Sequence, residues 1–505
     1  MINNKQKFLF IFALLQIHTS YNIDFNQQSR DIKTLIYQTY QQLTQSNTPN
    51  ITVKNLAQEQ GNFPTEFDFS VSSSSTQNEE NSGNNTWSRS YIKTVTGHEY
   101  HRTPEFACKS WEHWQDDIDK VIHLGCNSYR FSIEWSRIQP TADHFDEAAI
   151  AHYVAIVEYC QNHNIKPTIC LHHYSDPIWF MEQGGFAKED NLQYFETYCQ
   201  KMYEVLRPYV GQWIVISQPV AYAVKSYKVG MMPPFLTNSG LENKVMLNMF
   251  KTHMNVYDMI HNSYNTTKIG IEPHVGICHQ IVQMQPANKI NPFDQLVANF
   301  ADRLYNKTLL RFFTDGHFRS LTPKIDIAYE PQAPQKFDFF ALSYYSPLAF
   351  NGTKTHAPAC SPECASPDNF RIIDKQGMYD AIVCASKLGK PVYVVENGIT
   401  TTNEDQRKLL LNSYLSAISQ AISDGYDVRG YSYWTLMNDY EWMDIKLQEH
   451  ETPCISEFGL YKNRVIDKNT GELDPNFKNH ELMLKDGGKY YKNIITRQRQ
   501  NSIEN

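Results

Sequence analysis

Residues 393–398 read Tyr393-Val394-Val395-Glu396-Asn397-Gly398, and they indicate the fold more clearly than any other stretch. The residues from 392 to 395 are β-branched or aromatic, which predicts a strand, and the Asn-Gly pair after it is a turn signal. A single carboxylate therefore stands where the strand ends. At the C-terminal end of a barrel strand, an acid is held facing a pocket, which is the position of a nucleophile.

A second stretch repeats this pattern and reads Trp213-Ile214-Val215-Ile216-Ser217-Gln218-Pro219. The first carboxylate is expected to have a partner acid at the end of this strand. The residue that stands there is Gln218, whose side chain is an amide. The two strand ends therefore predict a paired site in which one carboxylate is missing.

Strand-like runs alternate with amphipathic helices through an evenly textured region from about residue 63 to about residue 495. Strands are predicted at residues 127–133, 166–171, 212–216, 269–271, 337–342, 391–395 and 428–433, and helices at residues 149–163, 190–206 and 406–423. Such alternation implies parallel βαβ units. About eight units without a Gly-rich phosphate loop favour an α/β fold of one (β/α)₈ TIM barrel over a doubly wound sheet.

Composition limits the partners of the chain. Its 505 residues are 41% hydrophobic and 13% aromatic, and 46 basic against 54 acidic residues leave a net charge of -8. No basic block or stripe is present, so nucleic acid is not an expected partner.

Residues 1–21 have the pattern of a secretory signal, with Lys5 and Lys7 before an apolar run. That run spans about ten residues, half of the roughly twenty that cross a bilayer, so no membrane span is predicted in the mature protein. Residues 22–62 are predicted to be a polar N-terminal extension, residues 63–495 one domain, and residues 496–505 a C-terminal tail. The expected location is the secretory pathway, ending outside the cell or in a lysosome- or vacuole-like vesicle.

Two further features agree with that route. Asn-x-Ser/Thr sites, which predict a glycoprotein, occur at Asn50, Asn84, Asn265, Asn306 and Asn351. Among ten cysteines, Cys360 and Cys364 lie four apart in a Pro-rich loop and predict a local disulfide. A metal pair is the alternative for these two cysteines, but no matching His/Cys cluster stands near them in the sequence.

The order of its motifs makes the chain resemble glycoside hydrolase family 1, the retaining β-glycosidases, over residues 63–493. The resemblance rests on blocks at residues 67–79, 129–140 (Tyr-Arg-Phe-Ser-Ile-Glu-Trp-Ser-Arg-Ile-Gln-Pro), 171–173, 213–219, 344–345, 395–398, 434–442 and 458–461. It implies a β-glucosidase-like hydrolase that takes a β-linked glycoside or oligosaccharide and needs no cofactor or metal. The oligomeric state is left open.

The resemblance also assigns roles to individual residues. It implies that Glu396 is the nucleophile, that Arg130 and Tyr345 contact it, and that Gln218 stands at the acid/base position. The retaining mechanism places two carboxyl groups about 5–5.5 Å apart, one attacking the anomeric carbon and the other transferring a proton. Matching positions for sugar binding are Gln77, His173, Ser217, Trp434, Glu441, Trp442 and Phe458. His172 is expected to serve packing.

Departures from the family pattern gather around this site. The family's Asn-Glu-Pro reads Ser217-Gln218-Pro219 here, and an amide has no proton to give near neutral pH. General acid–base help contributes about 10²–10⁴-fold, or about 3–5 kcal/mol of barrier. Other positions also differ from the family pattern: Lys109, Ser110, Glu80 and Ser343.

Three functions are compatible with these motifs. The first is a β-glycosidase that is impaired or biased toward activated leaving groups such as aryl or thio glycosides, because thioglucoside-cleaving family members also carry glutamine at this position. The second is a non-catalytic secreted protein that binds a β-glycoside or a protein partner in the same pocket. The third is a purely structural secreted protein.

Overall fold

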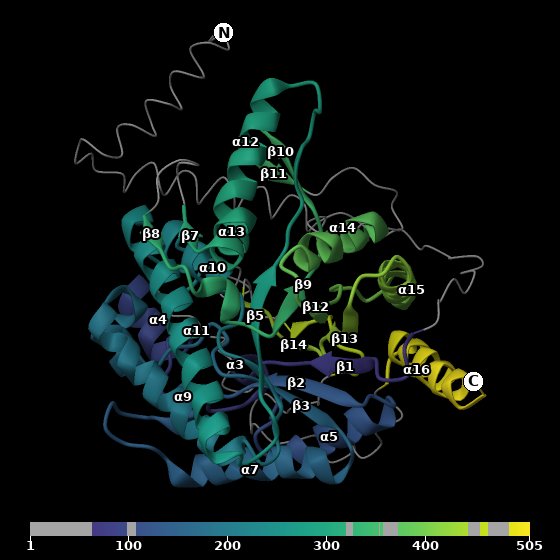
Figure 1. Cartoon of the computed structure of the whole chain (residues 1–505), viewed down its shortest axis with the longest axis horizontal. Coiled ribbons are helices and arrows are strands. Elements are labelled where there is room, and N and C mark those ends of the chain that lie inside the picture. The colour runs from purple at the N-terminus through teal and green to yellow at the C-terminus, as the bar shows by residue number, and fades with distance from the viewer. Residues whose placement is uncertain are drawn as a thin grey trace. The chain divides into compact units, whose positions relative to one another are not determined.

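The computed structural model describes residues 63–97, 108–319, 327–352, 354–356, 372–442, 455–462 and 484–504. Eight parallel strands close into a barrel in the order β1-β13-β12-β9-β5-β4-β3-β2. They are β1 (Asp68–Ser72), β2 (Ser128–Ser132), β3 (Lys166–Cys170), β4 (Gln212–Ile214), β5 (His274–Gln280), β9 (Phe339–Ser343), β12 (Val392–Asn397) and β13 (Val428–Trp434). The predicted TIM barrel is confirmed, and Figure 1 shows its strands among the surrounding helices.

Helices lie between the strands, and a last helix follows them. The longer ones are α5 (Trp114–His123), α7 (Glu147–Asn162), α9 (Leu192–Leu206), α11 (Ser239–Thr267), α12 (Pro292–Asp302), α14 (Lys375–Ser386), α15 (Glu404–Ser423) and α16 (Asp486–Glu504). Side-chain caps start several of them. Asp146 accepts from the backbone N–H groups of Ala148 and Ala149, and Asn403 accepts from that of Asp405. Such caps satisfy N–H groups that the first helical turn leaves without partners.

Shorter α-helices and strands lie between these elements. The helices are α3 (Ser75–Asn78), α4 (Arg89–Thr96), α6 (Trp135–Ile138), α8 (Ile178–Glu182), α10 (Pro219–Ala223) and α13 (Thr308–Asp315). Strands outside the barrel are β6 (Met284–Pro286), β7 (His317–Phe318), β8 (Ala328–Tyr329), β10 (Leu348–Asn351), β11 (Lys354–His356), β14 (Asp439–Tyr440) and β15 (Ile455–Ser456). Strands β6, β10 and β11 form a small sheet beside α12 (Figure 1).

The barrel interior is filled by a compact set of side chains. Its buried apolar members are Cys170, Ile214, Cys278, Phe339, Ala341 and Val395. Gly276 of β5 gives this set its room, because a Cβ there would stand 2.3 Å from the Phe339 ring. The interior is therefore a packed core, and the chemistry has to lie at the strand ends.

Two predictions of element bounds were wrong. Residues 269–271 do not form a strand, and β5 begins three residues later at His274. The reason is Gly270, which has φ +93°, and the neighbouring Ile269 is 53% exposed. At the C-terminal end, α16 continues through residue 495 to Glu504, so the predicted boundary of the tail falls inside a helix.

Four of the predicted Asn-x-Ser/Thr sites lie among the described residues. Asn306 is buried and its amide nitrogen donates to the Val282 carbonyl, so this Asn-x-Thr site is inaccessible in the folded protein. Asn84, Asn265 and Asn351 are exposed. The signal segment, residues 22–62 and the Cys360–Cys364 pair lie outside the described residues. Among the helices that are described, none has both the length and the apolar character that crossing a bilayer requires.

Candidate active site

Glu396 lies at the C-terminal end of β12 and is 3% exposed. Its strand pairs in parallel with β9, where Glu396 stands opposite Ser343, and with β13 on the other side. The parallel pairing brings the ends of all three strands to one mouth of the barrel. The register shifts next to Glu396, and such an irregularity redirects a side chain at a strand end.

Arg130 of β2 forms a buried ion pair with Glu396 across the barrel mouth. Its Nη1 lies 2.6 Å from Glu396 Oε1, and its Nη2 donates to Ser217 Oγ at 3.1 Å. Burial by itself lowers the pKa of the guanidinium, but the charge of Glu396 outweighs this and the net shift is upward. The arginine therefore stays charged, and it holds the carboxylate in one orientation.

Gln218 follows β4 and contacts Glu396 directly. Its Nε2 donates to Glu396 Oε2 at 2.7 Å and to Ser343 Oγ at 3.0 Å. Retaining glycosidases keep their two carboxyl groups about 5–5.5 Å apart, because the reacting carbon lies between them. In this structure the amide occupies that gap.

Two hydroxyl groups complete the surroundings of the carboxylate. Tyr345 donates to Glu396 Oε2 at 3.2 Å, and Ser217 makes a longer contact to Oε1 at 3.5 Å. With Arg130 and Gln218, four side chains thus donate to Glu396. All five residues were proposed from the sequence as members of one site, and the structure brings them together.

The side chains expected to bind sugar form a second layer beside this centre. His173 stacks on Trp434 at 5.7 Å between ring centroids and on Trp442 at 6.1 Å. Burial, followed by the nearby Arg130 charge, lowers the pKa of His173 well below its usual value, so the imidazole is neutral. A neutral imidazole can both donate to and accept from a hydroxyl group.

The remaining predicted sugar contacts lie in α3, which follows β1, and in the segments after β13. Gln77 is fully buried, and its amide nitrogen donates to the carbonyl of Tyr440, the residue before Glu441. The ring of Phe458 lies 6.3 Å from that of Tyr345. His172 packs as expected, since it is buried and its Nε2 lies 3.1 Å from Asp176 Oδ1.

Sequence reasoning missed two residues that touch this centre, Tyr174 and Cys278, and a third, Trp87, that holds Tyr174. Tyr174 donates to Gln218 Oε1, Trp87 donates to the Tyr174 carbonyl, and Cys278 lies 3.8 Å from Ser217 Oγ. Tyr174 could have been found because it directly follows His173 at the end of β3. Trp87 and Cys278 carry no such signal, since they stand in a loop and inside a strand.

Three of the other substituted positions, Glu80, Lys109 and Ser110, lie around Gln77, whereas Ser343 stands opposite Glu396. Glu80 accepts from the backbone N–H groups of Trp111 and Glu112 at 3.2 and 3.0 Å. Lys109 pairs with Glu112 at 3.5 Å, and the backbone N–H of Ser110 donates to the Asn78 carbonyl. These residues therefore hold the loop after α3 in place.

Glu79 belongs to the same buried loop and has a perturbed pKa. Burial raises its pKa to about 7, while Arg137 and the Tyr153 hydroxyl oppose the shift and Glu134 and Glu80 add to it. A carboxyl group that holds its proton longer in the folded chain than in the unfolded chain stabilises the fold at low pH.

We expect the free energy of unfolding to fall by about 3 kcal/mol between pH 4.5 and pH 7 through Glu79. Below pH 4.5 both states are protonated, and above pH 7 both are ionised, so the change is confined to this window. Urea denaturation across the window measures it. Glu79→Gln should flatten the profile, and Glu66→Gln at an exposed position should not. A Glu79→Gln profile as steep as the native one would contradict the assignment.

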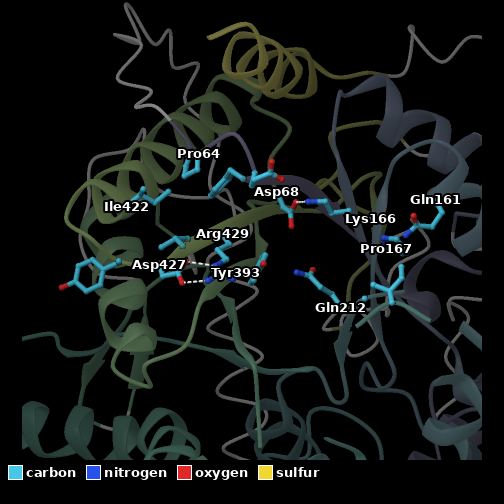
Figure 2. Close-up of a pocket in the computed structure, with 16 residues that line it drawn as sticks. Pro64, Asp68, Gln161, Lys166, Pro167, Gln212, Tyr393, Ile422, Asp427 and Arg429 are labelled. Atoms are coloured by element: carbon cyan, nitrogen blue, oxygen red, sulfur yellow. Dashed lines mark hydrogen bonds and ion pairs between the residues drawn. The ribbon is translucent and has the colours of Figure 1, made fainter. Parts of the chain in front are cut away.

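A cavity of about 590 Å³ lies at the opposite end of the barrel (Figure 2). It is lined by the first residues of β1, β3, β4 and β13, and Figure 2 shows its ion pairs Lys166–Asp68 and Arg429–Asp427. Glu396 does not line it. Because the functional groups of such barrels lie at the C-terminal strand ends, the candidate site is the Glu396 centre and not this cavity.

Comparison with known proteins identifies the family. The profile described as Glycosyl hydrolase family 1 matches residues 59–500, which include every side chain around Glu396. The chain belongs to glycosyl hydrolase family 1.

Relatives within glycosyl hydrolase family 1 are distant in sequence. Lactase/phlorizin hydrolase of Homo sapiens is 24% identical over 84% of this chain, which spans about a quarter (24%) of that protein's length. Beta-glucosidase A of Acetivibrio thermocellus is 23% identical and matches 86% of this chain and 98% of its own.

Solved structures of the family share the fold. The beta-glycosidase from Pyrococcus horikoshii superposes with a TM-score of 0.73 at 29% identity, covering 87% of this chain and 96% of that one. The family 1 β-glucosidase from Thermotoga maritima has a TM-score of 0.73 at 21% identity and covers 87% and 99% of the two chains. The barrel is therefore shared by this chain and both proteins.

Proposed function

We propose that the chain is a retaining β-glycosidase of β-glucosidase type whose turnover is biased toward activated leaving groups. The observation that carries the proposal is the buried Arg130–Glu396 pair at 2.6 Å, at the barrel mouth beside His173. Membership of the family and its β-glucosidase relatives support the reaction class. The substrate is a β-linked glycoside or oligosaccharide.

The reaction proceeds in two displacements on Glu396. In the first, a carboxylate oxygen of Glu396 forms a bond to the anomeric carbon, and the bond from that carbon to the leaving oxygen or sulfur breaks. In the second, water attacks the same carbon, Glu396 leaves, and the proton passes to solvent. Arg130 and Tyr345 keep the carboxylate oriented in both steps.

Gln218 determines which substrates react. It stands where a proton donor is needed, and its amide cannot protonate the departing group, so that group must leave as a stable anion. The missing acid–base help corresponds to about 3–5 kcal/mol of barrier. Aryl and thio-linked glycosides supply such leaving groups, whereas alkyl glycosides do not.

The expected result is that a 2-deoxy-2-fluoroglucoside with a dinitrophenyl leaving group labels Glu396 covalently. The fluorine slows both steps, and the good leaving group restores the first, so the glycosyl-enzyme accumulates. Mass spectrometry of the intact protein and of its peptides locates the label. Glu396→Ala should stay unlabelled and should also fail to turn over a nitrophenyl β-glucoside.

Two other outcomes would replace the proposal. Sugar binding by calorimetry without any adduct would make the chain a non-catalytic β-glycoside-binding protein. No binding of glucose, galactose or cellobiose, together with no adduct, would leave a structural role.

We further propose that the protein is delivered through the secretory pathway to the cell exterior or to an acidic vesicle. N-terminal sequencing of the mature protein and cell fractionation test this proposal.

A further inference from the structure

Two residues with strained backbones face each other at the barrel mouth. Tyr174, beyond the end of β3, has φ +62°, and Gln218, beyond the end of β4, has φ +48° and ψ +58°. Left-handed conformations cost residues other than glycine about 1–3 kcal/mol each and persist only where the surroundings impose them. For a bulky aromatic side chain such a φ is a genuine outlier.

A short hydrogen bond joins these two residues. The Tyr174 hydroxyl donates to Gln218 Oε1 at 2.6 Å. Burial raises the pKa of Tyr174 well above its usual value, so the hydroxyl keeps its proton and remains a donor. The Glu396 carboxylate accepts from Nε2 and determines which way the amide of Gln218 points, and the Tyr174 hydroxyl satisfies the oxygen on the other side.

Every polar atom of the amide then has a partner. Oε1 accepts from Tyr174, while the two hydrogens on Nε2 are directed to Glu396 and Ser343. Reversing the amide would turn its oxygen toward the Glu396 carboxylate and its NH₂ group toward the Tyr174 donor. The contact between the amide oxygen and the carboxylate, which both only accept, would be repulsive, so one orientation is selected.

The Tyr174 ring is itself held on several sides. Trp87 Nε1 donates to the Tyr174 carbonyl at 2.7 Å, and Trp442 meets the ring edge-on at 5.8 Å. Tyr222 stacks parallel to it at 6.4 Å, and Lys225 Nζ lies 5.7 Å from the ring centroid. The hydroxyl is therefore presented at a fixed place.

We propose that Tyr174 is a positioning residue that holds the Gln218 amide against Glu396, so that a sugar must displace this amide before it can reach the carboxylate. The proposal rests on the proposed function, because it concerns access to the same nucleophile. Its basis is the 2.7 Å distance between Gln218 Nε2 and Glu396 Oε2. Retaining glycosidases hold the two groups at these positions about 5–5.5 Å apart around the reacting carbon, so the amide must move away. A ligand binds only those molecules in which the amide has moved away from Glu396. Its apparent affinity is therefore its intrinsic affinity multiplied by the fraction of such open molecules.

Tyr174→Phe should therefore raise affinity for a glycone-sized ligand. In Tyr174→Phe, Gln218 Oε1 has no hydrogen-bond donor while the amide lies against Glu396. The variant therefore destabilises this closed arrangement and not the open one, in which a sugar has displaced the amide. We expect the Kd for deoxynojirimycin, measured by calorimetry, to fall about 3- to 10-fold. The KM for a nitrophenyl β-glucoside should fall by the same factor while kcat stays unchanged.

Tyr222→Phe is the matched control, because it also removes a buried hydroxyl next to the same ring. That hydroxyl donates to Asp176 Oδ2 at 2.6 Å and not to Gln218. The control should bind deoxynojirimycin as the native protein does. Equal gains in both variants, or no gain in Tyr174→Phe, would overturn the proposal.

Gln218→Ala keeps the proposal testable if Tyr174→Phe does not fold, because it removes the amide itself. It should show at least the same gain in affinity, and unchanged or weaker binding would overturn the proposal. Binding needs no turnover, so the two proposals fail separately. Tighter binding by Tyr174→Phe without any labelling of Glu396 would refute the proposed function alone, and labelling without tighter binding would refute the role of Tyr174 alone.

Discussion

Gln218→Glu is expected to accelerate cleavage of alkyl β-glucosides about 10²–10⁴-fold. A carboxyl group at this position can protonate the leaving oxygen and then deprotonate water, which the amide cannot do. Nitrophenyl glucosides should gain far less, because their leaving group departs as a stable anion without a proton. The size of the gain should therefore rise with the pKa of the leaving group.

The surroundings of Gln218 favour a working acid in this variant. A carboxylate placed 2.7 Å from Glu396 would be repelled by it, which favours the protonated form of the new acid. Tyr174 already donates to the side-chain oxygen at position 218, and Ser343 lies 3.0 Å from the amide nitrogen. Both hydroxyl groups can make hydrogen bonds to the new carboxyl group.

Rates with a series of glucosides whose leaving groups differ in pKa measure this effect. Gln218→Met is the matched control, since it also removes the contact between the amide and Glu396 but supplies no acid. It should speed all substrates alike through easier binding. Equal acceleration of alkyl and nitrophenyl glucosides by Gln218→Glu would contradict the assignment of position 218.

Glu396→Ala is expected to abolish turnover and to lower the free energy of unfolding by about 3–5 kcal/mol. Arg130 is 1% exposed, and without the carboxylate its charge would be buried and unpaired. Gln218 and Tyr345 would also lose an acceptor. If Glu396 lay at a solvated strand end, Glu396→Ala would abolish turnover without lowering the free energy of unfolding.

Urea denaturation at neutral pH measures the loss of stability, and the rate with a nitrophenyl β-glucoside measures the loss of turnover. Glu396→Gln is the control for shape, because it keeps an oxygen that can accept from Arg130 while removing the negative charge. Its loss of stability should be smaller than that of Glu396→Ala, although its loss of turnover should be as large. Arg130→Met should destabilise by a similar amount, and the double variant Arg130→Met/Glu396→Ala by less than the sum. Additive losses would mean that the two side chains do not stabilise each other.

Much of the fold and the members of the site could be predicted from the sequence. Alternating β-branched and amphipathic segments imply parallel βαβ units, and parallel strands bring their C-terminal ends together whatever the details of packing. Arg130 and Glu396 lie in such strands and Gln218 follows one, so their meeting was expected. Residues 269–271 show the limit of this reasoning. Their sequence predicts a strand, but Gly270 turns the chain there and no strand forms.

The sequence by itself determined the barrel, the family and the carboxylate at the end of β12. Only the tertiary structure decided that the amide of Gln218 closes on Glu396, 178 positions away in the chain, and that Tyr174 holds it there from 44 positions away. The choice between a touching pair and an open gap depends on side-chain rotamers and on two strained backbones. These are set by the rings packed around Tyr174, which come from distant segments, and no local pattern of residues carries that information.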